Sequence, residues 1–375
     1  VFDTVDPGYA DELAAAYQRT EAAIAASLSN YGQYTTLHGF EIPAWIPASE
    51  PDIAAIGLLG MSAYYAARPN DASADAITKV ADALAEYRLG TDSEYPFGMH
   101  PSNANAPGFW HNWGAHVPHA LVIAGMALER QDWIDSAAAT AESFLLRQLA
   151  FEPFRHIGVV PYRLEQIAYG TNMLVQTYAA LYSATNDERY AQLAALAGSW
   201  YFGNNMADTQ MYYPDSGRTY DGINGPVAWR VNRNAGAEST IEGLMSMSAL
   251  ARLPEAAQPF LYATTLEETL PIILQAEDGD RVIGTPVYYS GTWTGEGYIS
   301  GGRYIGLGEG QRMRLTFTLD EDQADDYLLY VAHVRQAANS SAFLIPRTDA
   351  PPTIDGSGAD WGDSALVLEA NTARQ

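Results

Sequence analysis

The chain has 375 residues, of which 47% are hydrophobic, and its 45 acidic against 20 basic side chains give a formal net charge of -25. Such a charge repels nucleic acids and anionic membrane surfaces, so we expect neither as a partner. The absence of cysteine excludes disulfides, thiol nucleophiles and thiolate metal sites, and no apolar run reaches the roughly 20 residues that would insert into a membrane.

Helical periodicity extends from Asp6 to Leu261. Apolar residues recur there at spacings of three and four, and alanine-rich stretches raise the helix propensity. Behind Ser49, Glu50 and Asp52 form the pattern of a helix start, and we expect them to cap that helix. The pattern predicts helices at residues 9–28, 51–67, 73–89, 116–129, 132–150, 164–183, 187–202 and 235–252.

Long segments rich in Gly, Pro, Asn and aromatic residues separate some of these helices. They cover residues 32–49, 91–114, 151–163 and 203–234, whereas very short polar turns join other neighbouring helices. This alternation is typical of a barrel, or toroid, of helical hairpins, in which the long loops gather at one rim. We therefore expect a mainly α protein with an α/α barrel over residues 1–262.

The periodicity changes from helical to alternating near Thr264. Met313, Leu315 and Phe317 alternate with polar residues, which predicts a strand, and residues 327–334 predict another. We expect an antiparallel β-sandwich module over residues 263–350. Residues 351–375 open with two prolines and are expected to form a linker and the start of a further β module.

Three carboxylates are candidates for acid and base catalysis of glycoside hydrolysis. That reaction needs one carboxylic acid that protonates the leaving oxygen and one carboxylate that acts on water or on the sugar. Glu238 stands where a long loop turns into a helix, Asp221 lies in the loop before it, and Glu165 lies near the start of the helix predicted at residue 164. Each has a structural alternative: a helix first turn, a turn cap and an ion pair with Arg163, respectively.

The densest aromatic and polar cluster runs from Phe109 to His116, followed by His119. Sugars stack their C–H faces on tryptophan and pair their hydroxyls with His and Asn, so this composition fits a substrate cleft. The spacing of His116 and His119 permits either a metal site or ordinary packing, and we expect no cofactor for catalysis. The candidate sugar-binding residues are Trp110, His111, Trp113, His116, Tyr169, Tyr220, Trp229, Arg230 and Arg233.

Three blocks resemble, in order and spacing, bacterial proteins of the six-hairpin glycosidase superfamily. They are SWYFGNN at 199–205, YDGI at 220–223 and NRNAGAEST at 232–240, and the resemblance covers roughly Trp110 to Leu250. It implies an (α/α)6 barrel and the cleavage or remodelling of polysaccharides, usually with Asp or Glu as acid and base. The Asp-Ala-Gly-Asp motif of family 9 cellulases is absent from the sequence, so no catalytic role follows from a motif.

The C-terminal part resembles carbohydrate-binding modules. LQAEDG at 274–279 with SGGRYIGL at 300–307 is similar to the opening strands of family 6 or 35 modules. In those modules the residue that matches Glu277 commonly ligates a structural calcium. PTIDG at 352–356, with Asp360 and Trp361 after it, is similar to the start of family 9 binding modules.

Together these features predict a secreted or cell-surface glycoside hydrolase-like protein that acts on a polysaccharide or oligosaccharide. One alternative is a non-catalytic glycan-binding scaffold with the same fold, and another is a polysaccharide lyase that removes a proton with Tyr, His and Arg. Geometry separates the three. Two carboxylates facing one cleft favour the hydrolase, a carboxylate-poor mouth favours the scaffold, and a Tyr, His and Arg cluster favours the lyase.

Overall fold

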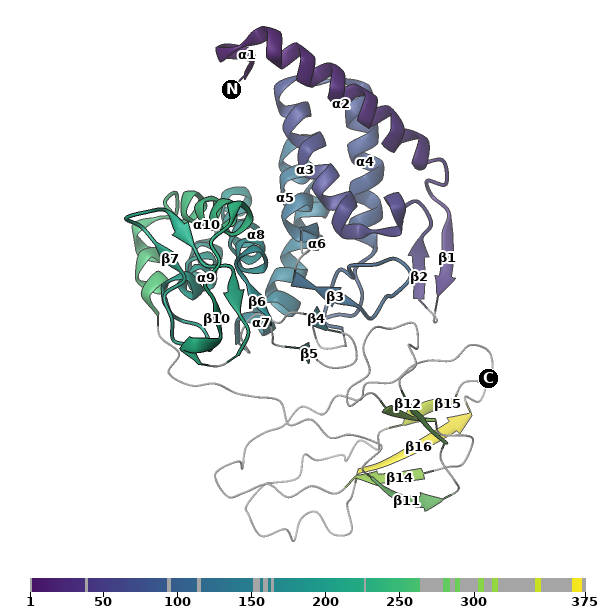
Figure 1. Ribbon diagram of the computed structural model, residues 1–375. Helices are drawn as coiled ribbons and strands as arrows, with labels where there is room; N and C mark the ends of the chain where they lie inside the picture. The colour runs from purple at the N-terminus through teal and green to yellow at the C-terminus, as the bar shows by residue number, and fades with distance from the viewer. Residues whose placement is uncertain are drawn as a thin grey trace. The chain divides into compact units, whose positions relative to one another are not determined.

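The computed structural model describes residues 2–37, 40–92, 96–112, 116–150, 156–157, 161–162, 165–225 and 227–263, and short strands beyond them. The chain divides into two compact units, residues 1–157 with 161–270, and residues 158–160 with 271–375. The described part of the first unit is mainly helical, as predicted (Figure 1). The domain boundaries expected at residues 262 and 350 stay predictions.

The helices of the first unit form two layers. In one layer α3 (Pro51–Ala67), α5 (Val117–Leu128), α8 (Ala168–Thr185) and α10 (Ala237–Leu250) pack side by side in chain order. The second layer holds α4 (Asp71–Glu86), α6 (Gln131–Thr140) and α9 (Glu188–Gly198), each packed on the helix before it, with η6 (Glu255–Tyr262) on α9. This is a series of helical hairpins, and Figure 1 shows the two layers.

Further helical segments extend this arrangement. Helix α6 continues through the π-helical turn η3 (Ala141–Leu145) into α7 (Leu146–Ala150), and α9 continues into η4 (Ser199–Phe202). At the N-terminal end, α1 (Phe2–Val5) precedes α2 (Pro7–Ser27), which packs on α3 and α4. The eight predicted helices are thus confirmed, with shifts of a few residues at most ends.

The core between the layers explains why these segments are helical. Buried apolar side chains of both helix layers meet in a single cluster. Helices α4, α6 and α9 face it with one apolar side, whereas α3 is apolar all round. Local caps set the ends: the Asn70 side chain accepts from the Ser73 N–H, and Asn186 adopts a left-handed conformation after α8. The largest fully buried side chains of the cluster include Trp45, Leu58, Ile77, Leu84, Trp133 and Tyr178.

A short strand precedes each helix of the first layer. These strands are β2 (Phe40–Pro43), β3 (Trp110–His111), β6 (Gln166–Ile167) and β10 (Val231–Asn232). Strand β2 pairs with β1 (Tyr34–Leu37), β3 with β4 (His156–Ile157) and β4 with β5 (Pro161–Tyr162). Strand β9 (Gly222–Ile223) lies between β6 and β10, and β7 (Tyr212–Tyr213) pairs with β8 (Arg218–Thr219).

Helix α8 begins later than the sequence predicts. We expected it from residue 164, but Gln166 and Ile167 form β6 and pair with Ile223 and Gly222. The Gln166 side chain also accepts from Trp200 Nε1 at 2.9 Å, which fixes the strand in the core. Glu165 therefore precedes a strand that leads directly into α8, and the prediction that it starts the helix is wrong.

The second unit is described by six short strands. Strands β11 (Asp280–Ile283), β14 (Arg312–Leu315), β16 (Leu366–Thr372) and β15 (Ser341–Leu344) form an antiparallel sheet in that order, and β12 (Val287–Ser290) pairs with β13 (Arg303–Gly306). The strand predicted from Met313 is confirmed over its first residues. Residues 327–334 and Glu277 lie outside the described residues, and the β-sandwich and its calcium stay predictions.

Within the residues that the structure describes, no helix combines the length and the apolar character needed to cross a bilayer.

Candidate active site

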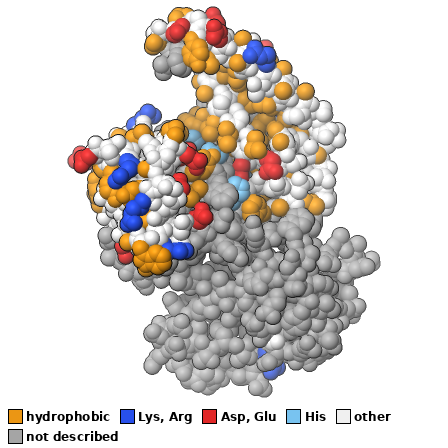
Figure 2. Space-filling view, viewed as in Figure 1, with side chains coloured by type: hydrophobic (Ala, Val, Ile, Leu, Met, Phe, Trp, Pro, Cys, Tyr) orange, Lys and Arg blue, Asp and Glu red, His pale blue; other side chains and the backbone are white. Residues whose placement is uncertain are grey.

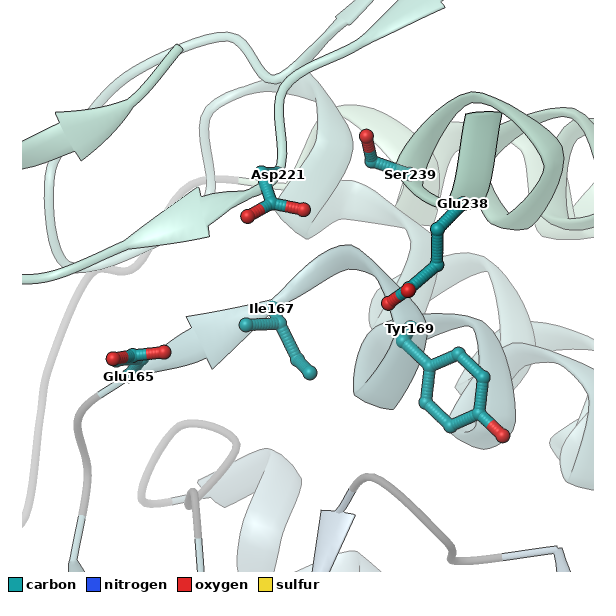
Figure 3. A pocket seen from close by; sticks show the side chains of 6 residues that line it. All are labelled: Glu165, Ile167, Tyr169, Asp221, Glu238 and Ser239. Carbon is teal, nitrogen blue, oxygen red and sulfur yellow. The ribbon is translucent and has the colours of Figure 1, made fainter. Parts of the chain in front are cut away.

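A cleft of about 430 Å³ opens where α8 and α10 begin. Figure 3 shows Asp221 and Glu238 turned toward the same space, Asp221 from the strand side and Glu238 from α10, with Glu165 farther along β6. The three carboxylates chosen from the sequence therefore line one cleft. Its lining consists of Glu165, Ile167, Tyr169, Asp221, Glu238 and Ser239.

Backbone hydrogen bonds on both sides hold Asp221 in place. Its N–H donates to the carbonyls of Asn232 and Asn234, at 3.2 and 2.9 Å, and its carbonyl accepts from the Ala168 N–H at 3.0 Å. Asn232 Nδ2 donates to Asp221 Oδ2 at 2.8 Å. The carboxylate is thus anchored between the start of α8 and the segment that leads into α10.

The environment of Asp221 favours its protonated form. Partial burial raises the pKa of the Asp221 carboxyl above its ordinary value, and the nearby negative charge of Glu165 raises that pKa further. A carboxyl of this kind keeps its proton to a higher pH than an exposed aspartate. This is the property that a general acid requires.

Glu238 stands in the first turn of α10, as the sequence predicts, and its side chain is exposed. Glu242 follows one helical turn later, is half-buried, and accepts from Asn172 Nδ2 at 2.5 Å. Burial raises the pKa of Glu242, and the charge of Glu238 raises it further. The sequence analysis missed Glu242, although a spacing of four residues places it on the same helix face as Glu238.

A tyrosine and a histidine meet beside the carboxylates. The Tyr169 hydroxyl lies 2.5 Å from His116 Nε2. Burial lowers the pKa of His116 to about 4, so its imidazole is neutral at pH 7. Burial also raises the pKa of Tyr169 to about 12, with smaller contributions from the charges of Glu242, Asp52 and Glu238. Asp52 therefore lies within electrostatic reach of Tyr169 at the mouth of the cleft, although it does not line the cleft.

Asp52 does not cap α3, so that prediction is wrong. Glu50 is the N-cap residue and makes no side-chain capping bond; its Oε1 accepts instead from Asn103 Nδ2 at 2.9 Å. The Asp52 side chain is turned inward, with Oδ2 3.3 Å from His111 Nε2. Burial raises the pKa of this carboxyl well above its ordinary value, although a hydrogen bond from Ser102 partly opposes the shift.

Two of the predicted sugar-binding aromatics lie in the core instead. Trp110 is 3% exposed and packs edge-on against Phe144, so it offers no face on which a sugar could stack. Tyr220 is buried in a cluster with Trp200 and Tyr201. The sequence did not indicate this burial, because it shows aromatic content but not which way each ring points, and the sugar-binding roles of both residues stay predictions.

The remaining candidates differ in their surroundings. Trp229 is 74% exposed in the 3-10 turn η5 (Ala228–Arg230), and Arg233 is exposed three residues after that turn. His111 and His116 lie at the mouth through their contacts with Asp52 and Tyr169. Trp113 lies outside the described residues.

Within the described part of the chain, no group of three or more His, Asp or Glu side chains is arranged to hold a metal ion. His119 lies one helical turn after His116 and is half-buried, and the burial of its ring lowers its pKa to about 4. Figure 2 shows acidic and histidine side chains gathered along the hollow between the α3–α5 and α8–α10 portions of the first unit. The arrangement is one of proton donors and acceptors.

No protein-family model and no curated protein matches the chain. Among solved structures, the chain is similar to a cellobiose 2-epimerase from Bacillus thermoamylovorans, with a TM-score of 0.40, 11% identity and coverage of 56% of this chain and 58% of that one. It is also similar to a sugar epimerase from a ruminal bacterium, with a TM-score of 0.42, 14% identity and coverage of 64% and 68%.

A third similarity is to a glycoside hydrolase family 76 mannosidase from Bacteroides thetaiotaomicron, with a TM-score of 0.45, 9% identity and coverage of 66% and 69%. The match to the first epimerase spans little more than half of that protein's length, 58%. All three TM-scores lie below 0.5, so these similarities are distant.

Proposed function

We propose that this chain hydrolyses glycosidic bonds, with Asp221 as the general acid and Glu238 as the carboxylate that acts on water or on the sugar. The observation that carries the proposal is the shared cleft, in which Asp221 and Glu238 face one space from two walls. Two carboxyl groups on either side of the scissile bond are what this reaction requires.

The two carboxyl groups differ in the way that acid and base must differ. Burial and the charge of Glu165 raise the pKa of Asp221, so this group keeps its proton to a higher pH than an exposed aspartate does. Glu238 is exposed, so water or a sugar can approach its carboxylate. Environments that give two carboxyl groups different pKa values are a general means of dividing the roles of acid and base.

The carbohydrate substrate is supported by where the sequence blocks lie. The block at 220–223 contributes Asp221, and the block at 232–240 contributes Glu238 and the Asn232 that bonds to Asp221. These segments, which resemble six-hairpin glycosidases, thus build the walls of the cleft. The closed toroid, the glycan substrate and a secreted or surface location are parts of the same proposal.

One observation favours a lyase as the second candidate. A lyase was expected to use a tyrosine, a histidine and an arginine, and the contact of Tyr169 with His116 provides the first two. Arg163, the arginine nearest to Glu165 in sequence, lies outside the described residues. However, a tyrosine that abstracts a proton needs an accessible phenolate, and the pKa of Tyr169 is raised to about 12. Hydrolysis is therefore the first candidate, and Tyr169 serves it as a hydrogen-bond donor to neutral His116.

The test is the release of reducing ends from a panel of polysaccharides by the whole chain. We expect Glu238→Gln and Asp221→Asn each to lower release at least about 100-fold, in line with the contribution of a positioned acid or base. Ultraviolet absorbance of unsaturated products, recorded in the same samples, would reveal a lyase. Unchanged release by both variants would overturn the assignment, and binding without release would favour the scaffold.

Glu165 provides a sharper test because it acts through Asp221. Glu165→Gln removes a negative charge that raises the pKa of Asp221, so the alkaline limb of the pH–rate profile should move to lower pH while the reaction persists. Glu188→Gln, an exposed change in the first turn of α9, is the matched control and should leave the limb in place. If the alkaline limb of the pH–rate profile does not move in Glu165→Gln, Asp221 is not the general acid.

A further inference from the structure

Three arginines beside the cleft have no acidic partner, although acidic residues outnumber basic ones in this chain by 45 to 20. Other basic side chains form ion pairs, as Arg68 does with Asp11 and Arg189 with Asp187. Arg218, Arg230 and Arg233 are exposed, and among the described residues none of them has a carboxylate oxygen within 4.0 Å. Their charge is therefore available to a ligand.

Their own hydrogen bonds leave most of the guanidinium donors unused. Arg230 Nη2 donates to the Asn224 carbonyl at 3.4 Å, and Arg233 Nη2 donates to the Ala228 carbonyl at 3.2 Å. A guanidinium carries five N–H groups, arranged so that two of them can bind one carboxylate. These contacts orient both side chains on the β9–β10 hairpin without neutralising them.

Aromatic rings lie among the three arginines. The Arg218 guanidinium stacks over Tyr213 and Tyr220, with its Cζ 4.7 and 5.0 Å from the ring centroids. The Arg230 Cζ lies 5.2 Å from the Trp229 ring centroid, and Trp229 remains 74% exposed. An exposed indole beside a cation can stack on a flat, uncharged face of a ligand while the cation binds an anionic group.

This surface is continuous with the wall of the cleft. The Asp221 N–H bonds to the carbonyls of Asn232 and Asn234, the two neighbours of Arg233 in the chain. Strand β10, which follows the turn with Trp229 and Arg230, pairs with β9 immediately after Asp221. Figure 2 shows basic side chains over this part of the first unit, on the face that also displays the acidic hollow.

We infer that the surface formed by Arg218, Arg230, Arg233, Tyr213 and Trp229 binds an acidic polysaccharide whose sugars carry carboxylates. The guanidinium groups pair with the uronate carboxylates, and Trp229 stacks on a sugar ring. The inference rests on the proposed function only where the bound polysaccharide is delivered to the cleft. The binding itself does not depend on that function. It names the substrate class as uronate-containing glycan.

The net charge of -25 does not oppose this binding at physiological ionic strength. Screening limits the reach of exposed charges to about 8 Å at 0.15 M salt. A bound carboxylate therefore responds to the arginines in contact with it far more than to distant acidic residues. Binding should weaken as salt rises above this concentration, since the contacts are exposed ion pairs.

The experiment measures binding of polygalacturonate to the whole chain carrying Glu238→Gln, by affinity electrophoresis and calorimetry. Fully methyl-esterified polygalacturonate has the same backbone without charge and should bind at least about tenfold more weakly. The double variant Arg230→Gln/Arg233→Gln should lose at least about tenfold in affinity. Arg19→Gln/Arg252→Gln removes the same charge at exposed positions elsewhere and should leave binding unchanged.

Each contrary outcome overturns the inference in a distinct way. Equal binding of the esterified polymer would show that charge is not recognised, and equal losses in the two double variants would show a non-specific charge effect. Polyglutamate binding as tightly as polygalacturonate, and unaffected by Trp229→Ala, would identify an acidic peptide site instead. Binding as predicted, with no reducing-end release by the native chain, would contradict only the proposed hydrolysis.

Discussion

Asp52 is a first-turn residue whose carboxyl is buried instead of facing solvent. Its carboxyl lies in the first turn of α3, where an exposed acid would interact favourably with the helix dipole. Here the side chain is 10% exposed and faces His111 instead. Because burial is the main cause that raises its pKa, the folded protein favours the protonated carboxyl. This is a cost to stability at any pH where an ordinary aspartate is ionised.

We predict that Asp52→Asn stabilises the protein at pH 8 more than at pH 4. A raised folded-state pKa means that the wild type loses stability as pH rises from the ordinary aspartate range, near 4, toward the raised value. The asparagine does not titrate, so the variant gains about 1.4 kcal/mol in the free energy of unfolding for each unit by which the pKa of Asp52 is raised. Urea denaturation at both pH values measures it.

The exposed first-turn residue Asp71 provides the control for this measurement. Asp71→Asn removes an exposed first-turn carboxylate that interacts favourably with the helix dipole, so it should lower rather than raise the stability at pH 8. A stability difference between wild type and Asp52→Asn that is the same at both pH values would contradict the burial argument.

At the scale of elements, the start of α8 depends on a close approach between a helix and a buried amide. Gly170 lies in the first turn of α8, and a Cβ added there would overlap the Asn112 side chain. Asn112 is 3% exposed, and neither of its side-chain polar atoms has a partner within the described residues. The missing Cβ of Gly170 is what allows α8 to lie directly against this residue.

Gly170→Ala should therefore destabilise the chain, although alanine favours helices. Overpacking a tight contact costs about 1–3 kcal/mol. Gly60→Ala is the matched change inside α3, where an added Cβ meets nothing within 4 Å, and it should stabilise by about 0.5–1 kcal/mol. Opposite shifts of the thermal midpoint are the expected result. A stabilised Gly170→Ala would mean that Asn112 is free to move aside.

Some elements could be predicted from a local sequence pattern, and others depend on residues far along the chain. Helix α3 was predicted to within a residue because its apolar, alanine-rich sequence runs unbroken for several turns between Pro51 and Arg68-Pro69. Strand β6 was missed because its two residues are strands only through pairing with Gly222 and Ile223, far along the chain. The burial of Asp52 likewise depends on His111, and no local pattern indicates it.

At the scale of the whole molecule, three buried histidines make the first unit sensitive to acid. Burial lowers the pKa of His100 to about 3, and of His116 and His119 to about 4. His100 is held by Thr140 Oγ1, 2.9 Å from its Nδ1, and lies near the positive charge of Arg88, which lowers the pKa further. All three are neutral in the folded protein at pH 7.

We predict that the three histidines lower the stability between pH 6.5 and pH 4.5, against the opposite contribution of the carboxyls whose pKa is raised, Asp52, Asp221 and Glu242. In the unfolded chain each histidine takes up a proton near pH 6.5, whereas the folded protein resists protonation until about pH 4 or below. The unfolded state therefore binds more protons in this window. The contribution of the histidines to stability should fall by up to about 1.4 kcal/mol per pH unit for each histidine. For the three together this is about 4 kcal/mol per pH unit.

His100→Gln tests this prediction because it removes one titrating group and leaves the other two. Glutamine can retain a polar contact with Thr140, so the variant should fold, and its stability should fall about one third less steeply below pH 6.5. Urea denaturation at pH 7, 5.5 and 4.5 gives the slope. Equal slopes for variant and wild type would mean that His100 takes up its proton without unfolding, and hence that the packing between the end of α6 and the segment that carries His100 opens in the native state.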